Sequence, residues 1–190
     1  MIEIKSLTKK YGELTILDNI SITLKKGSKN AIMGSSGKGK TTLLRIIAGL
    51  EHSSNGTATT NGNIAYMFQE PALLPWKRAR DNVRSVLKKC NYHLVEKYLE
   101  AVDLSEAIDK FPHELSGGMA QRVAFARFLA FAEATNADVL MLDEPFSALD
   151  RETADKMSSI LLKIAEGRTL LLVTHDINQA NRLDCNIINI

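Results

Sequence analysis

The sequence is poor in cysteine, proline and aromatic residues, and neither sign of charge dominates it. Its 190 residues include 2 cysteines, 4 prolines and 6% aromatic residues, and 24 Lys+Arg stand against 22 Asp+Glu. Cys90 and Cys185 lie 95 positions apart, which is no metal-ligand spacing, and two thiols are too few for a disulfide scaffold. The composition therefore favours a reducing compartment. The near-neutral balance excludes a strongly basic sleeve, and we expect no nucleic-acid partner.

Long apolar runs are also missing. The runs at residues 139–142 and 170–173 are only four residues long, whereas a membrane-spanning helix needs about 20 apolar residues. Residues 1–5 carry neither the apolar stretch nor the cleavage site of a signal peptide. We therefore expect a cytoplasmic protein that reaches a membrane only through a partner. The apolar fraction of 45% excludes a disordered chain.

Hydrophobic patterning predicts strands in the first part of the chain. Residues 2–5 and 20–24 alternate polar and apolar side chains around a break at Tyr11-Gly12, which is typical of an antiparallel pair. A short apolar strand at 31–33, a glycine-rich loop and a helix at 40–49 follow. Strand, loop and helix in that order form half of a parallel βαβ unit.

The rest of the chain predicts a helical insert and then a return to α/β order. Residues 50–63 are polar and turn-rich, a strand is expected at 64–68, and the helical insert includes an apolar helical spacing over 94–104. After residue 137 we expect a strand at 139–142, a helix at 152–165 and a strand at 170–173. The predicted fold is a single α/β domain over 1–190, with a mostly parallel sheet core, a small N-terminal antiparallel lobe and a helical insert. In it, 1–71 and 131–190 form the core with the β lobe, and 72–130 form the helical subdomain.

The glycine-rich loop predicts phosphate binding. Residues 34–41 read G-S-S-G-K-G-K-T, which satisfies the pattern G-x-x-x-x-G-K-[ST]. Glycines let successive backbone N–H groups point at phosphate oxygens, and the following helix adds its positive end. Lys40 can reach the terminal phosphates, and the Thr41 hydroxyl can ligate Mg²⁺. The alternative is a glycine-rich turn without a ligand. The residues expected to bind are Gly34, Ser35, Ser36, Gly37, Lys38, Gly39, Lys40, Thr41 and Thr42.

Two carboxylates follow the apolar run at 139–142. Strand alternation predicts that Asp143 and Glu144 point to opposite sides, so that they can hold different roles. Asp143 could hold Mg²⁺ opposite Thr41, and Glu144 could polarise an attacking water. The alternative is a strand end capped by two solvated acids.

A third motif, L-S-G-G-M-A-Q-R at 115–122, makes the pattern more specific. With the two motifs above, the chain resembles the ATP-binding cassette (ABC) family over about residues 2–185. The resemblance implies ATP and Mg²⁺ as cofactors, and catalysis by Glu144, Gln69 and His175. It implies that Tyr11 stacks on adenine, that Gln69 also contacts Mg²⁺, and that residues 147–150 form the family's D-loop. The fold it implies is a P-loop ABC nucleotide-binding domain.

The resemblance also implies a dimer. In the family, the residues matching Ser116, Gly117 and Gly118 face the γ-phosphate bound by a second subunit, and the residue matching Asp150 crosses the interface. Small residues at a helix start expose N–H donors and a hydroxyl to an anion. We therefore expect a second ABC ATPase subunit as partner, as a homodimer that closes on two ATP molecules.

Residues 72–76, A-L-L-P-W, and 112–114, P-H-E, resemble ATPase subunits of nitrate, sulfonate, taurine and thiamine-precursor importers. This implies an ATP-hydrolysing subunit that drives solute import by a separate transmembrane permease, with a solute-binding protein acting through that permease. The expected location is the inner face of the cell membrane. Trp76 and Leu74 are expected to be exposed and to contact the permease, and packing within the insert is the alternative.

Other interpretations of the sequence stay open, and the chain departs from the family pattern at several positions. A soluble ABC ATPase of the DNA-repair or cofactor-assembly type is the main alternative, although the repair type usually carries a coiled coil that this sequence lacks. A module without hydrolysis is disfavoured by the presence of Glu144 and His175. Lys38 and Ala120 differ from the family pattern, and the segment between Gly49 and Gln69 is short. The chain stops 15 residues after His175, where importer subunits commonly continue.

Overall fold

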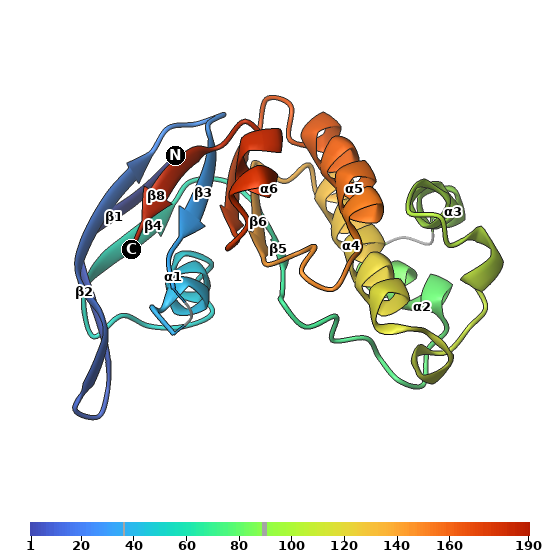
Figure 1. Cartoon of the computed structure of the whole chain (residues 1–190), viewed down its shortest axis with the longest axis horizontal. Helices are drawn as coiled ribbons and strands as arrows, with labels where there is room; N and C mark the ends of the chain where they lie inside the picture. Colours follow the sequence, from blue (N-terminus) through green and yellow to red (C-terminus); the bar gives the residue numbers. More distant parts are fainter. Residues whose placement is uncertain (36, 89–90) are drawn as a thin grey trace.

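The structure is a computed structural model that describes residues 1–35, 37–88 and 91–190. Figure 1 shows an antiparallel sheet at one end of the molecule, a parallel sheet in the middle, and the short helices α2 and α3 at the other end. Ser36 and Cys90, which the sequence singled out, lie outside the described residues.

The antiparallel sheet consists of β1 (Ile2–Tyr11), β2 (Leu14–Leu24) and β4 (Asn55–Thr60) in the order β2-β1-β4. The predicted antiparallel pair is confirmed, because β1 and β2 pair on either side of a two-residue turn. Residues 50–63, which the sequence marks only as polar and turn-rich, contain a strand that it did not predict, because β4 pairs with β1. β4 is mostly exposed and contains Gly56, so it lacks the apolar alternation that reveals a strand.

The parallel sheet contains all the predicted core strands. β5 (Ile64–Met67), β6 (Val139–Asp143), β7 (Thr169–Val173), β3 (Lys29–Met33) and β8 (Asn186–Asn189) are neighbours in that order, and all pairs are parallel. The sequence did not predict β8 or the preceding helix α6 (Ile177–Arg182). β8 is a four-residue edge strand with largely exposed side chains, which explains the missing signal.

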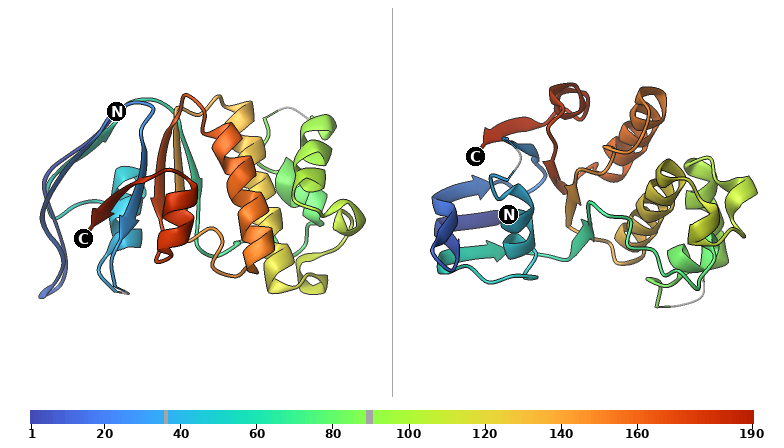
Figure 2. Two further views of the ribbon diagram at one scale, coloured as in Figure 1. Left: turned by 45° about the horizontal axis from the view of Figure 1, so that its top comes forward. Right: turned by 60° about the horizontal axis from the view of Figure 1, so that its bottom comes forward.

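Both faces of the parallel sheet are covered, so its central strands are apolar throughout. In β6, Val139 and Met141 pack with α1 (Lys40–Ile47) and the antiparallel sheet. Leu140 and Leu142 pack on the opposite face with α4 (Gly117–Ala134) and α5 (Arg151–Ile164). Alternation therefore divides one strand between two hydrophobic clusters. Figure 2 shows α4 and α5 side by side in two further views.

The helical part contains α2 (Ala79–Arg84), α3 (Tyr92–Ala101), two short 3₁₀ turns (Ser105–Ala107 and Pro112–Glu114) and α4. α3 is the helix expected over 94–104 and ends earlier, because the chain turns at Asp103 with φ 54°. α4 crosses the boundary predicted at residue 130, so the division of the domain stays a prediction. Within the described ranges, no helix combines the length and apolarity needed to cross a bilayer.

Candidate functional site

The predicted site residues lie around one edge of the parallel sheet. Three neighbouring strands, β6, β7 and β3, are followed by Glu144, by Thr174-His175 and by the loop at 34–39. The carboxyl ends of parallel strands meet at one edge, where α/β folds place their ligands. Gln69 follows β5, the next strand along, and is exposed. Residues that follow four neighbouring strands therefore lie along the same edge of the sheet.

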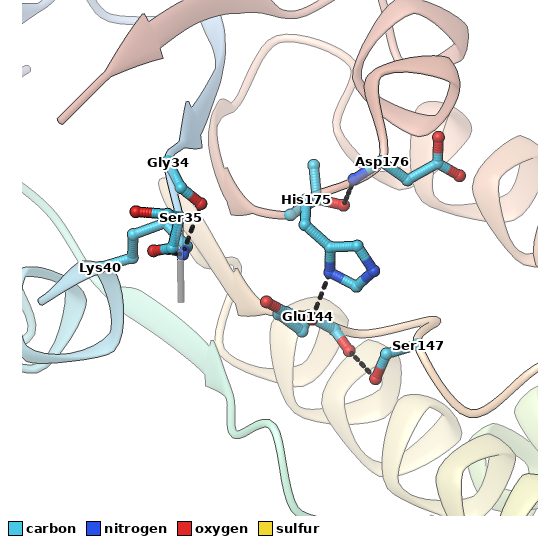
Figure 3. Close-up of polar contacts among 8 residues, drawn as sticks. Gly34, Ser35, Lys40, Glu144, Ser147, His175 and Asp176 are labelled. Carbon is cyan, nitrogen blue, oxygen red and sulfur yellow. Dashed lines mark hydrogen bonds and ion pairs between the residues drawn. The ribbon is translucent and has the colours of Figure 1, made fainter. Parts of the chain in front are cut away.

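The loop at 34–39 is shaped by glycine and held by Lys40. A Cβ on Gly39, which has φ +79°, would lie 2.6 Å from Ile16 Cγ2 and 2.9 Å from Leu17 Cδ2, so β2 packs too closely for any other residue. The Lys40 Nζ donates to the carbonyls of Gly34 and Ser35, both at 2.9 Å. These bonds hold a buried ammonium group against the loop (Figure 3). The loop therefore concentrates positive charge at the start of α1.

Asp143 is buried at the end of β6, where it faces Thr41. Its residue is 1% exposed, and its Oδ1 has no hydrogen-bond partner among the described residues. Burial raises the pKa of the Asp143 carboxyl, whereas a hydrogen bond with Thr41 and the charges of Arg45 and Lys40 lower it. A buried oxygen without a partner costs stability unless something binds it. A hydroxyl, one carboxylate and phosphate oxygens form the ligand set that Mg²⁺ prefers.

Glu144 lies beyond the strand, in a left-handed turn with φ 44°. Because Glu144 is not part of β6, strand alternation does not determine where its side chain points, and the prediction that it does is wrong. The turn separates the two acids in another way, because the Glu144 Oε2 pairs with the His175 Nδ1 at 2.8 Å. The Ser147 Oγ donates to the Glu144 carbonyl at 3.1 Å. Figure 3 shows His175 pointing at Glu144 across from Lys40.

Tyr11 lies at the end of β1 and is tied to the start of α1. Its hydroxyl donates to the Glu51 carboxylate, and the Thr42 side chain also hydrogen-bonds with it. The Lys9 Nζ lies 4.7 Å from the Tyr11 ring centroid and pairs with Glu51 at 2.9 Å. The Glu51 bond raises the pKa of Tyr11. The ring is half exposed and is linked to α1 through Thr42.

The residues expected to meet a second subunit lie at helix starts, where Ser116, Gly117 and Asp150 are exposed and Gly118 is half-buried. Ser116 caps α4 by accepting from the Met119 N–H at 3.2 Å, with Gly117 and Gly118 in the first turn. Asp150 caps α5 by accepting from the Thr153 N–H at 2.9 Å. Hydrogen bonds from Thr153 lower the pKa of the Asp150 carboxyl. Lys38 is also exposed, at the outside of the phosphate loop.

Sequence reasoning missed three polar residues that hold this site together. Gln121 in α4 donates from its Nε2 to the Pro145 carbonyl at 2.9 Å. Arg127 in α4 donates to the carbonyls of Pro71 and Ala72, just after Gln69. Glu51 holds Tyr11. All three act on backbone or on another side chain through the tertiary fold, so no local spacing reveals them.

Comparisons with known proteins agree on one family. The family model described as "ABC transporter" matches residues 17–147. An "Aliphatic sulfonates import ATP-binding protein SsuB 1" of Pseudomonas savastanoi pv. phaseolicola is 44% identical over 177 residues, covering 90% of this chain and 73% of the relative. An SsuB protein of Corynebacterium glutamicum is 40% identical over 185 residues, covering 93% and 74%.

Two solved structures share the fold over the whole chain. One is the "Dimeric structure of a post-hydrolysis state of the ATP-binding cassette MJ0796 bound to ADP and Pi", with TM-score 0.90 and 31% identity, covering 100% of this chain and 94% of that one. The other, the "Dimeric Structure of MJ0796, a Bacterial ABC Transporter Cassette", has TM-score 0.87 and 32% identity with the same coverage. The predicted α/β fold with a parallel sheet core is thereby confirmed.

Proposed function

This chain belongs to the ABC transporter family, and on that premise we propose how its residues bind and hydrolyse ATP. It is an ATP-hydrolysing subunit of an ABC importer, and the soluble non-transport alternative is not favoured. The loop at 34–42 would bind the phosphates through backbone N–H groups and Lys40. Tyr11 would stack on adenine beside it.

The unpartnered Oδ1 of buried Asp143, next to Thr41, carries the assignment of the metal site. Thr41, Asp143 and Gln69 would hold Mg²⁺ together with phosphate oxygens. When bound, Mg²⁺ neutralises charge that develops on the transferred phosphoryl group. Buried and charged, Asp143 is costly to the free protein, and the metal would offset that cost.

Glu144 is the group that we propose as general base. It would accept a proton from a water molecule aligned with the γ-phosphate. The His175 Nδ1 lies 2.8 Å from the Glu144 Oε2, and His175 would orient both this carboxylate and the γ-phosphate. Positioning and fixed charges supply most of the catalysis in phosphoryl transfer. Gln69, in the exposed segment after β5, would support catalysis as well as contact Mg²⁺.

The subunit acts with a second cassette and with a membrane permease. We propose a homodimer in which Ser116, Gly117 and Gly118 of one copy contact the nucleotide of the other, with Asp150 at the interface. The exposed N–H groups at the start of α4 suit an anion brought by another molecule. ATP binding would close the dimer and hydrolysis would release it.

A cavity of about 490 Å³ between α4 and β5 supports one position for the permease. Its lining is mostly apolar, with Phe68 and Phe128 among the residues, and it contains one cation, Arg127, and one carboxylate, Glu70. We propose that a cytoplasmic helix of the permease docks there and that Trp76, which is 71% exposed, extends the contact. The expectation of an exposed Leu74 is wrong, since it is half-buried and its N–H donates to Asn82 at 2.7 Å.

The permease would determine both the location of this chain and the solute that is transported. The chain would lie at the inner face of the membrane, held by that partner, and a solute-binding protein would act through the same permease. The relatives named for aliphatic sulfonate import suggest an organosulfonate as the solute. Deleting the gene should then impair growth on a sulfonate as sole sulfur source and leave growth on sulfate unchanged.

Glu144→Gln is the variant that tests the ATPase assignment. It should abolish hydrolysis and accumulate an ATP-bound dimer in the presence of Mg²⁺, measured by phosphate release and by light scattering. Glu152→Gln is the matched control, because Glu152 is an exposed carboxylate in the first turn of α5. Normal hydrolysis by Glu144→Gln, or a monomer at saturating ATP, would contradict the mechanism.

Affinity purification from detergent-solubilised membranes, with Glu144→Gln as bait and Mg-ATP present, tests the partner. Recovery of a protein with several membrane spans supports the transporter role. Recovery of soluble proteins alone, or of DNA, would move the assignment to a non-transport ATPase.

A further inference from the structure

One buried side chain of α4 is bonded to the turn that carries Glu144. Gln121 is 2% exposed, and its Nε2 donates to the Pro145 carbonyl at 2.9 Å. A buried amide that donates to a buried carbonyl leaves neither group unpaired, and losing the donor would leave the carbonyl without a partner. The catalytic scheme above gives Gln121 no role, so its function needs a separate explanation.

The turn at Glu144 requires such support. Glu144 has φ 44°, a conformation that a non-glycine residue rarely adopts. Its N–H donates to the Val173 carbonyl at 2.9 Å, which holds the turn from the side of β7. Gln121 holds the next residue from the side of α4. The direction of the Glu144 carboxylate therefore depends on the position of α4 as well as on the sheet.

Packing extends the same connection along the segment. The Phe146 ring meets the Phe125 ring of α4 edge-on, with centroids 5.4 Å apart and planes at 80°. Closer to the helix start, a Cβ built on Gly118 would lie 3.5 Å from the Ala148 carbonyl oxygen. The segment after Glu144 thus follows α4 closely from its first turn to its middle.

α4 consequently connects two sites that the proposed dimer keeps apart. Its start, Ser116–Gly118, would contact the nucleotide of the second copy, and Gln121 lies only about 7 Å further along the helix axis. We propose that Gln121 is a positioning residue, through which contact of the α4 start with the second copy's nucleotide sets the orientation of Glu144 in its own site. This inference depends on the proposed function, because it takes Glu144 as the base.

Substitutions at Gln121 test the positioning role in the full-length protein. Gln121→Met keeps the side-chain length and removes the donor, so kcat should fall about tenfold, the effect of one lost bond to a buried carbonyl. The KM for ATP and the affinity for a non-hydrolysable ATP analogue should stay unchanged, because the phosphate loop is untouched. Arg122→Met is the matched control, since Arg122 is the next residue of α4 and donates to the Val102 and Asp103 carbonyls instead of to the segment after Glu144.

Gln121→Glu adds a readout that a purely structural role would not give. Its carboxyl can donate to the Pro145 carbonyl only when protonated, and burial favours the protonated form. The activity of Gln121→Glu relative to the parent should therefore recover as the pH falls. The proposal would be overturned if Gln121→Met kept the kcat of the parent, or if Arg122→Met lowered kcat by the same factor. It would also be overturned if the activity of Gln121→Glu relative to the parent did not change with pH.

Mixed dimers test the transmission itself. Two differently tagged copies are combined, one with Lys40→Ala so that its phosphate loop binds no ATP, and the rate of the intact copy is measured. A partner without ATP should lower the hydrolysis rate of a copy with Gln121 more than that of a copy carrying Gln121→Met. The second copy has already lost the contact between Gln121 and the Pro145 carbonyl. Independent, multiplicative effects would overturn the inference. Normal hydrolysis in Glu144→Gln would instead overturn the proposed function, so the two failures are distinguishable.

Discussion

The residues proposed to meet ATP fall into two groups that differ in burial. Lys40 and Asp143 are 7% and 1% exposed and are held by the chain's own loop and sheet. Ser116 and Asp150 are exposed, and their side chains accept hydrogen bonds from the first turns of their own helices. The first group is organised by one copy of the chain, whereas the second is exposed and open to contact by another molecule. In the proposed dimer, one chain would therefore contribute two half-sites.

Lys40→Ala should have the largest effect, because it removes the positive charge from the first, buried group of residues. The carbonyls of Gly34 and Ser35 would lose their donor, and the phosphates would lose a buried charge. We expect ATP binding to disappear in isothermal titration while the secondary structure in circular dichroism is retained. Normal ATP hydrolysis by this variant would show that the phosphate loop is misassigned.

Asp143→Asn should separate activity from stability within the same group. Hydrolysis should fall by about a hundredfold or more, because a charge that holds the metal is lost. The Tm at neutral pH should rise. Burial raises the pKa of folded Asp143, so this carboxyl favours the folded state below the unfolded pKa and loses that contribution as the pH rises through the folded pKa. The Tm difference from the parent should therefore shrink as the pH falls, and a lower Tm in the variant at neutral pH would contradict this explanation.

Ser116→Asp tests the exposed group without disturbing its helix. Asp is as good an N-cap as Ser, so α4 should begin normally. Its negative charge would repel the phosphates of a second copy's nucleotide, and ATP-dependent dimerisation should weaken by about tenfold or more. ATP binding by the single chain should not change. Ser116→Asn, also a good cap but uncharged, is the control, and equal dimerisation of the two variants would remove Ser116 from the interface.

Lys38→Ser should have the smallest effect, since Lys38 is exposed although it lies within the loop. An exposed charge contributes about 1 kcal/mol at most, so the affinity for ATP should change by about tenfold or less. Titration with ATP at low and high salt measures this change, and the difference in affinity between Lys38→Ser and the parent should be smaller at high salt. Loss of ATP binding would place Lys38 in the first group.

The sequence was sufficient to predict elements with strong hydrophobic patterns. The apolar runs at 139–142 and 170–173 became β6 and β7, because strands buried on both faces are apolar throughout. β4 and β8 were missed, since both are held by main-chain pairing and expose most side chains. Local composition does not report pairing with a strand that lies far away in the sequence.

Site residues were predictable where a motif fixes chemistry locally, as in the loop at 34–42. The arrangement around them was not. The turn at Glu144 depends on the Val173 carbonyl, and the contact of Gln121 with Pro145 spans 24 positions. Leu74 was misjudged for the same reason, because Asn82 bonds its N–H and holds it half-buried. Tertiary hydrogen bonds leave no spacing rule in the sequence.

The order of strands in the parallel sheet also has a consequence for biosynthesis. β7 lies between β6 and β3, although it is the last of the three to be made. Until residues 169–173 leave the ribosome, no strand pairing links β3 to β6 among the described residues, because both pair with β7. Non-local pairing of this kind slows folding and exposes unpaired strand edges. A nascent chain should therefore acquire ATP affinity in one step, when β7 enters the sheet, and depend on chaperones before it.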